Sequence, residues 1–436
     1  MMATDRAEDT IFAPLGLAGR SAVTSLRISG ERTLAVLRAL GAGRPQPRRA
    51  SLRALRTTDG ELLDRALVIW FPAPGSFTGE DCAEFHLHGG VAVLHGVADA
   101  LMDLGVRPAD PGEFSRRAFL NGRMDLLQAE AISDLVAAET AGQRHQALRQ
   151  MDGALGVLYQ DWSRRLTRVL AHQEALIDFP DEDLPDSIEQ ALRDEIAALR
   201  AAVGAHLHDG RRGERLREGL VFAVVGPPNA GKSTLVNALA RREVAIVSAE
   251  AGTTRDAIEV RMDLGGVPVT IVDTAGLREA TGEIEAEGVR RAVAHAEAAD
   301  LAIVVREAGR PGDSWPLTAP RVLHVATKID LAAAPGDATV GVSAVSGAGL
   351  DDLRERLCEQ ARDLTANHGP PPLTRLRHRR LLEIVQHRLA DAMAEKATEL
   401  RAEDLRGALH AIGQLTGKIG VEQLLDSIFR DFCIGK

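Results

Sequence analysis

A glycine-rich loop offers the first chemistry in this sequence. The stretch VVGPPNAGKST (224–234) has the spacing GxxxxGK[ST] between an apolar run and the amphipathic stretch STLVNALARR. A loop that joins a strand to a helix in this way cradles phosphates with its backbone N–H groups, while its lysine reaches the β- and γ-phosphates and its serine binds Mg²⁺. The motif therefore predicts a nucleoside triphosphate site at Gly226, Asn229, Ala230, Gly231, Lys232, Ser233 and Thr234.

Two further motifs predict the metal and γ-phosphate contacts. VDTAG ends an apolar run and provides Asp273 for the metal, directly or through water, and the Gly276 amide for the γ-phosphate. Between the glycine-rich loop and the next strand, AGTTRD offers Thr253 or Thr254 to complete the Mg²⁺ site. Mg²⁺ binds oxygen ligands of these kinds together with phosphates.

Two last motifs discriminate between purine bases. In ATKID, Thr327 precedes Lys328, which can cover the base, and Asp330 can accept hydrogen bonds from guanine N1–H and N2–H₂. Adenine lacks that pair of donors. In GVSAVSG the backbone at Ser343 and Ala344 can donate to the guanine oxygen. The motifs occur in this order at the ends of apolar runs, and together they predict a GTPase.

The residue that orients the attacking water must be an unusual one. Ras-like proteins place a glutamine directly after DTAG, but this chain has Leu277 there, which cannot position water. No arginine finger is evident, although Arg255 and Arg278 are near. Something else must neutralise the transition-state charge, and the candidates for orienting water are the acidic residues Glu279, Glu283, Glu285 and Glu287.

Four regions of the chain must position these motifs. Residues 1–121 mix short apolar runs with Gly and Pro, which predicts an α+β domain. Residues 122–217 and 366–436 carry apolar residues three or four apart, which predicts amphipathic helices. Residues 218–365 alternate apolar runs with helical segments, as a parallel sheet does. The favoured architecture is one helical domain with an inserted α/β domain, and separate helical domains are the alternative.

Composition and charge exclude several classes of protein. No run approaches the ~20 apolar residues that cross a bilayer, and the first residues contain no apolar signal core. The three cysteines show neither metal-ligand nor disulfide spacing, which favours a reducing, cytoplasmic setting. The formal net charge of −10 gives no general attraction to polyanions.

Contact with nucleic acid would therefore need a local basic patch. Three arginine-rich stretches are candidates, and for each of them solvated surface charge is the ordinary alternative. They are residues 44–56, 211–217 and 375–380.

From end to end the chain resembles the MnmE (TrmE) family of tRNA-uridine modification GTPases. The resemblance rests on SFTGEDCAEFHLHGG and PGEFSRRAFLNGRMDLLQAEAISDLV near the start, DTAGLREATGEIEAEG in the middle, and LTGKIGVEQLLDSIFRDFCIGK at the end. It implies an N-terminal α+β domain that binds folate and forms a homodimer. It also implies a discontinuous helical domain interrupted by a Ras-like P-loop G domain.

The resemblance implies a function as well. With the flavoprotein MnmG (GidA), in a heterotetramer, the family modifies carbon 5 of the wobble uridine of certain tRNAs with an aminomethyl or carboxymethylaminomethyl group. A tetrahydrofolate derivative, 5-formyl or 5,10-methylene, supplies the one-carbon unit. A switch GTPase of ribosome assembly is the main alternative, but such proteins usually carry an RNA-binding module, often with a GxxG clamp loop, and none is evident. Intact Lys232, Ser233 and Asp273 disfavour a folate-binding module with a degenerate G domain.

Family membership would also explain how GTP is hydrolysed without a water-orienting glutamine and without an arginine finger. The family's G domains dimerise across their switch regions when K⁺ is bound, and K⁺ stands where an arginine finger would. Glu285 matches the glutamate that orients water, and Thr254 matches the Mg²⁺-linked threonine. The residues that match the family's K⁺ ligands are Asn229, Ser248, Glu250 and Thr253. Of these, Ser248 also matches a contact to GTP.

The family's folate contacts match residues at both ends of the chain. They are Arg27, Glu84, Arg123 and Lys436, with Arg123 where the family usually has lysine. Cys433 is near enough to be a candidate reactive thiol, and packing beside the folate is its alternative role. Its position also fits a prenylation box, but the residues that follow it, ending in lysine, argue against a lipid anchor.

Three features depart from a simple family match. Thr327 stands where the family usually has asparagine, which predicts weaker guanine binding without loss of specificity. Residues 308–320 are short for a crossover helix and predict a trimmed or irregular edge of the G domain. His86 and His88 share one face of a predicted strand, but a third metal ligand is not evident.

Overall fold

The computed structural model describes most of the chain. The described residues are 9–16, 19–178, 186–242, 258–273, 290, 293–310, 318–319, 321–336, 340–366, 369–395, 397–420, 425, 428–430, 432 and 435. The chain divides into two compact units, one drawn from residues 1–133, 156–160 and 412–436, and the other from 134–155 and 161–411. No described helix is long and apolar enough to cross a membrane.

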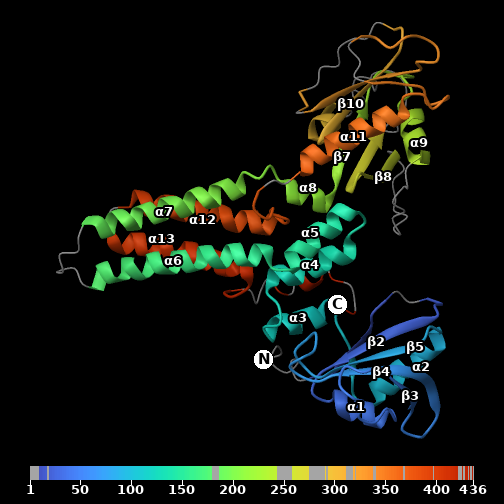
Figure 1. The fold of residues 1–436 in the computed structure, drawn as a ribbon, viewed down its shortest axis with the longest axis vertical. Coiled ribbons are helices and arrows are strands. Elements are labelled where there is room, and N and C mark those ends of the chain that lie inside the picture. Colours follow the sequence, from blue (N-terminus) through green and yellow to red (C-terminus); the bar gives the residue numbers. More distant parts are fainter. Residues whose placement is uncertain are drawn as a thin grey trace. The chain divides into compact units, whose positions relative to one another are not determined.

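The first unit is built on a six-stranded sheet in the order β3-β4-β5-β2-β1-β6 (Figure 1). Neighbouring strands are antiparallel, except that β1 and β6 are parallel. The strands are β1 (Ile11–Pro14), β2 (Val23–Ser29), β3 (Ser51–Arg56), β4 (Leu62–Phe71), β5 (Cys82–His88) and β6 (Arg107–Pro108). The predicted N-terminal α+β fold is confirmed.

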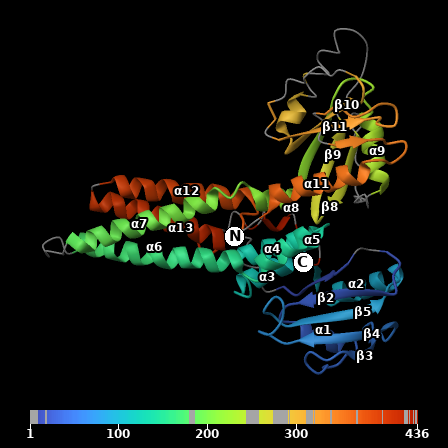
Figure 2. The same cartoon turned by 45° about the horizontal axis from the view of Figure 1, so that its top comes forward.

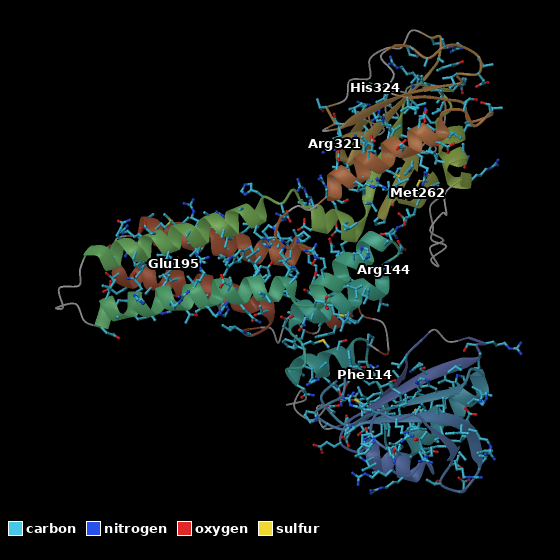
Figure 3. All side chains as sticks on the ribbon, in the orientation of Figure 1. Phe114, Arg144, Glu195, Met262, Arg321 and His324 are labelled. Atoms are coloured by element: carbon cyan, nitrogen blue, oxygen red, sulfur yellow. The ribbon has the colours of Figure 1, made fainter. Side chains whose placement is uncertain are left out.

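The two faces of this sheet are covered differently. Because side chains alternate along a strand, one face is apolar and packs against α1 (Thr33–Ala39) and α2 (Val91–Asp103). On the other face, Phe114 of α3 (Glu113–Leu120) packs with Phe77 over β1 (Figure 3). Farther along that face, Leu52 and Leu67 lie opposite each other on β3 and β4 and are 63% and 43% exposed.

The end of the chain packs onto the first unit. Leu425, Phe429 and Phe432 form a small core with Leu126 and Ala129 of α4 (Leu126–Ala137). A Cβ at Gly435 would collide with the carbonyl oxygen of Pro14 at the end of β1, so the backbone approaches β1 closely there. The tail thus lies next to the N-terminal sheet.

The second unit contains a helical bundle (Figures 1 and 2). The Arg165 guanidinium of α6 pairs with Glu195 of α7 at 2.7 Å (Figure 3), and Gln173 of α6 donates to the carbonyl of Thr398 in α13. Helices from before and after the G domain therefore form one bundle, as the favoured architecture predicts. Its helices are α5 (Ala141–Met151), α6 (Ala154–Asp178), α7 (Asp186–Leu207), α8 (Arg212–Glu218), α12 (Leu376–Ala394) and α13 (Thr398–Thr416).

Between α8 and α12 the chain forms the α/β part of this unit. Its sheet has the order β12-β11-β10-β7-β9-β8. Apolar residues of α9 (Lys232–Arg242) and α11 (Leu350–Thr365) cover one face, and Ala296 and Ala299 pack on the other. The strands are β7 (Leu220–Val225), β8 (Ile258–Leu264), β9 (Val267–Asp273), β10 (Leu301–Glu307), β11 (Val322–Thr327) and β12 (Val340–Val342).

Two expectations concern this sheet: that it is parallel, and that its edge near residues 308–320 is trimmed or irregular. The sheet is not wholly parallel, because β8 runs antiparallel to β9 across a tight turn in which Gly265 and Gly266 both have positive φ. The strands on either side of residues 308–320 are regular, since β10 and β11 pair in parallel from Ala302 to Glu307. The described residues between those strands contain no helix, while 311–317 and 320 lie outside the described part.

Two chain crossings join the bundle to the α/β part, and arginines tie them together. Arg379 of α12 pairs with Asp209 at 2.9 Å and with Glu214 of α8 at 3.0 Å. Arg375 and Arg217, one from each crossing, both pair with Asp134. Because Glu214 is only 1% exposed, this cluster buries charge that is compensated within the fold.

Candidate nucleotide-binding site

The glycine-rich loop lies at the carboxyl end of β7, between that strand and α9. Strand β7 is flanked by β9 and β10, and Val224 is opposite Asp273, so the buried Asp273 carboxylate lies at the level where the loop begins. In open α/β sheets ligands bind at these carboxyl ends. The structure thus brings Asp273 to the phosphate loop.

The loop's backbone explains its sequence. Gly226 has φ +152°, and a Cβ there would collide with the carbonyl oxygen of Val305 in β10. Gly231 has φ +88°, and Asn229 adopts a left-handed conformation with φ +61° that asparagine tolerates better than most residues. The loop can take this shape because small or αL-tolerant residues stand at each of these positions.

Lys232 folds over the loop. Its Nζ donates to the carbonyl oxygens of Gly226 and Pro227 at 2.8 and 2.9 Å, and the residue is 8% exposed. Ser233 follows it at half-buried depth in the first turn of α9, whereas Thr234 is exposed. An ammonium held within a loop of N–H groups at a helix N-terminus suits phosphate oxygens.

Thr327 joins the phosphate loop to two strand ends through its hydroxyl. Its hydroxyl, on a residue that is 3% exposed, donates to the carbonyl oxygen of Ala230 at 2.6 Å and lies 3.1 Å from that of Arg306, a second acceptor. The threonine hydroxyl therefore bonds to the neighbouring backbone. It connects the phosphate loop with the ends of β10 and β11.

The two loops that are predicted to bind the base follow β11 and β12. Lys328 has φ +58°, Asp330 is exposed, and the backbone N–H of Ile329 donates to the carbonyl of Val342 at 3.3 Å. The buried Ser343 shapes the second loop, since its Oγ accepts from the backbone N–H of Ser346 at 3.2 Å. Ala344 is half-buried in the same turn.

One residue near this site was not predicted. The Glu307 carboxylate, at the end of β10, lies 3.0 Å from the Lys328 ammonium and so orients the lysine expected to cover the base. In the sequence, the only indication of this contact is a glutamate at the end of the apolar run that forms β10, the strand next to β11. Only the strand order shows that this carboxylate meets Lys328.

Several predicted residues lie outside the described part of the structure. They include both candidate threonines, the K⁺ loop, the residues after DTAG and two tail residues. By number they are Ser248, Glu250, Thr253, Thr254, Arg255, Gly276, Leu277, Arg278, Glu279, Glu283, Glu285, Glu287, Cys433 and Lys436.

Comparison with known proteins decides the family. Residues 10–123 match the family model of the GTP-binding protein TrmE N-terminus, and residues 126–433 match that of the MnmE helical domain. The chain belongs to the MnmE family of tRNA modification GTPases. It is 56% identical to the tRNA modification GTPase MnmE of Gluconacetobacter diazotrophicus over 98% of both chains. It is 52% identical to that of Granulibacter bethesdensis, covering 98% of this chain and all of the relative.

In this MnmE-family chain the first unit brings two predicted folate contacts together. Arg27 on β2 and Glu84 on β5 are opposite each other in register, and their Nη2 and Oε1 atoms are 2.8 Å apart. The Arg27 guanidinium lies over Phe77 and Phe114, at 4.9 and 5.6 Å from the ring centres. Such contacts fix an arginine in one orientation.

Arg123 lies close to the same loop. Its side-chain stem passes over Gly79, two residues after Phe77, and its own side chain is exposed. Arg27, Glu84 and Arg123 thus surround the loop containing Phe77 and Gly79. The tail residues Phe432 and Gly435, which bracket Cys433 and precede Lys436, pack on the same unit.

The two histidines of FHLHGG do not form a metal centre with other described residues. His88 Nδ1 is 2.7 Å from Asp64, and His86 Nε2 is 3.9 Å from Glu84. Burial opposes the charge of Asp64, but hydrogen bonds from the backbone of His88 and from its ring hold the pKa of that carboxyl below its usual value. Among the described residues no group of three potential ligands comes together.

Proposed function

We propose that this tRNA modification GTPase hydrolyses GTP with Mg²⁺ and K⁺ as cofactors and, with the flavoprotein MnmG (GidA), modifies carbon 5 of the wobble uridine. The product is an aminomethyl or carboxymethylaminomethyl group whose one-carbon unit comes from a tetrahydrofolate derivative. The observation that carries the proposal is a family member's intact phosphate loop combined with an Arg27–Glu84 pair beside the C-terminal tail.

The residues of the G domain fit these cofactors. Ser233 at the start of α9 and Thr254 would hold Mg²⁺, with Asp273 nearby at the end of β9. The exposed Asn229 would be one K⁺ ligand, together with Ser248, Glu250 and Thr253. Oxygen donors suit both hard cations. When bound, K⁺ would supply the positive charge that no arginine finger provides.

The first unit fits a folate in charge and shape. A pterin edge resembles guanine and can donate to a carboxylate such as Glu84, while a glutamate tail suits Arg27, Arg123 and Lys436. A homodimer through this domain, which the family resemblance implies, is part of the proposal. We assign the complete assembly to the cytoplasm as a heterotetramer with the flavoprotein.

Two salts test the K⁺ requirement. We expect GTP hydrolysis by the natural chain to be much faster in KCl than in NaCl at equal ionic strength, with GTP binding similar in both. Equal rates would refute activation by K⁺.

Glu285 should orient the attacking water, because Leu277 cannot. Glu285→Ala is expected to bind GTP normally and to hydrolyse it slower by several orders of magnitude. Glu287→Ala is the matched control and should stay close to the natural rate. Near-normal turnover of Glu285→Ala would remove Glu285 from this role.

Wobble nucleosides separate this function from a switch role in ribosome assembly. Mass spectrometry of tRNA from cells that lack the gene should show loss of the modified uridine, and the natural chain should restore it. Unchanged nucleosides would favour the ribosomal role.

A further inference from the structure

The structure neutralises two of the three arginine-rich stretches internally. In residues 211–217, Arg211 pairs with Glu214 at 2.6 Å and Arg215 with Asp300 at 3.0 Å. Arg217 pairs with Asp134. This stretch holds α8 in place and leaves little cationic surface.

The stretch 375–380 is used in the same way. Arg375 and Arg379 pair with carboxylates at 2.7 to 3.0 Å, and His378 is fully buried. What looks in the sequence like a basic patch on α12 is therefore mostly the clamp between the two chain crossings.

The remaining stretch differs. The stretch predicted at residues 44–56 holds five arginines and no carboxylate. With the turn and the start of β4 added, residues 44–65 hold six arginines against three carboxylates, in a chain with a formal net charge of −10. Among the described residues none of these six arginines forms an ion pair, and one of the three carboxylates, Asp64, is taken by His88. We call this surface the arginine edge, and it consists of Arg44, Arg48, Arg49, Arg53, Arg56 and Arg65.

The arginine edge lies along one side of the N-terminal sheet. Strand β3 is the edge strand, and the loop before it runs beside β4, where the Arg48 N–H donates to the carbonyl of Trp70 at 2.7 Å. The Arg44 guanidinium lies 5.3 Å from the centre of the Trp70 ring, and that of Arg48 lies 5.7 Å from Phe71. Arg44 and Arg48 thus contact aromatic rings, and Arg48, Arg49 and Arg56 donate to the uncharged oxygens of Gly75, Gln46 and Gly60. All six arginines except the half-buried Arg53 are exposed.

We propose that the arginine edge contacts the phosphate backbone of the tRNA. The inference rests on the proposed function only in taking tRNA as the substrate that this chain itself touches. A protein with net negative charge needs a concentrated local patch to attract a polyanion. Arginine donates in a planar fork that matches phosphate oxygens, and contacts of this kind position an RNA without reading its sequence.

The test compares two triple variants of the full chain with the same change in charge. R44Q/R49Q/R65Q removes three exposed members of the edge. The control R164Q/R200Q/R380Q removes three arginines that are exposed on helices of the bundle. The probe is an unmodified transcript of a tRNA with a wobble uridine, titrated over a series of KCl concentrations with and without the flavoprotein.

We expect the edge variant to bind tRNA at least about tenfold more weakly, and its slope of log K against log[KCl] to flatten by about 2 to 3. The control should keep the natural affinity and slope, and basal GTP hydrolysis should stay unchanged in both. Equal tRNA binding by the two triple variants would overturn the proposal. Normal tRNA binding with lost flavoprotein binding would also overturn it, and would assign the edge to an acidic protein surface.

Binding of tRNA by the unmutated chain is a further test of the proposal. If this chain shows no salt-dependent tRNA binding, alone or with the flavoprotein, the arginine edge is not an RNA surface. The wobble-nucleoside analysis would still decide the proposed function independently.

Discussion

Single side chains hold the nucleotide site together across strands that are far apart in sequence. The Thr327 hydroxyl bridges the phosphate loop and the end of β10, and Glu307 of β10 meets Lys328 of the base loop. Both contacts are made by small groups at strand ends. The affinity for nucleotide therefore depends on residues that need not touch it.

Thr327→Val tests this role with a side chain of nearly the same shape. Losing the hydroxyl leaves buried carbonyls of Ala230 and Arg306 with one hydrogen bond fewer, a cost of about 1 to 2 kcal/mol. We expect GDP and GTP to bind roughly five- to thirtyfold more weakly, with guanine still preferred to adenine. Fluorescent nucleotide titrations measure both.

Thr327→Ser keeps the hydroxyl and serves as the control, so its affinity should remain near that of the natural chain. If the valine variant bound nucleotide as tightly as the serine variant, the hydroxyl bridge would have no part in binding.

At the scale of elements, α8 and the start of α12 hold the two crossings between the bundle and the α/β part. Arg379 of α12 contacts Asp209, Glu214 and the carbonyl of Leu207. Removing one partner of a buried ion pair costs more than the pair contributes, because the other charge stays buried. The joint is thus sensitive to loss of its arginine.

Arg379→Ala should lower the free energy of unfolding by about 2 to 4 kcal/mol. The loss should be smaller than for a carboxylate left with no partner, because Glu214 still pairs with Arg211. Urea unfolding of the full chain measures the loss. The neighbouring Arg380 is exposed, and Arg380→Ala should change stability by less than about 0.5 kcal/mol. Similar losses in both variants would contradict a specific clamp.

The end of α7 should respond to acid. Burial lowers the pKa of His206 to about 4, and the nearby His378 and Arg379 act in the same direction, against Asp209. Since the unfolded histidine titrates near 6.5, the unfolded state binds the extra proton between these values. Stability is then complete above about pH 6.5 and falls as the pH decreases toward 4.

Trp162 provides the measurement, because its ring packs edge-on 5.5 Å from His206. In a background with Trp162 as the single tryptophan, urea unfolding at pH 5.5 should give a free energy about 1 kcal/mol lower than at pH 7.5 through this histidine. His206→Gln should lose that part of the pH dependence. If the natural protein and the His206→Gln variant lost the same free energy of unfolding between pH 7.5 and 5.5, His206 would not be the source of the pH dependence.

At the scale of the whole molecule, the residues of the two proposed sites lie in separate units. The phosphate loop lies within the second unit, while Arg27, Glu84 and the last residues of the chain lie within the first. In the first unit the chain's end approaches β1 at Gly435, because only glycine tolerates the contact with Pro14 together with φ +97°.

Gly435→Ala should therefore displace the end of the tail and weaken binding of 5-formyltetrahydrofolate about tenfold or more, while basal GTP hydrolysis remains normal. Calorimetric titration with the folate and a phosphate-release assay provide the two readouts. Gly420→Ala also replaces a tail glycine with positive φ and controls for general strain. Unchanged folate binding in Gly435→Ala would separate the tail from that site.

Much of this protein can be predicted from its sequence, because the decisive signals are local. The order of the motifs predicts the GTPase, apolar periodicity predicts the helices that later prove to form one bundle, and family-specific stretches identify the family. Glycines at 226 and 231 already indicate a tight phosphate loop, since each short motif carries its own backbone requirement.

Relations between distant residues could not be predicted from the sequence and emerge only from the folded chain. The antiparallel β8, the Glu307–Lys328 pair and the bridge made by Thr327 all depend on strand order, which no local pattern contains. The same is true of charge: three stretches look equally basic in the sequence. Folding brings carboxylates to two of them and leaves the edge of the N-terminal sheet uncompensated, because an arginine's charge is neutralised only by what lies near it in space.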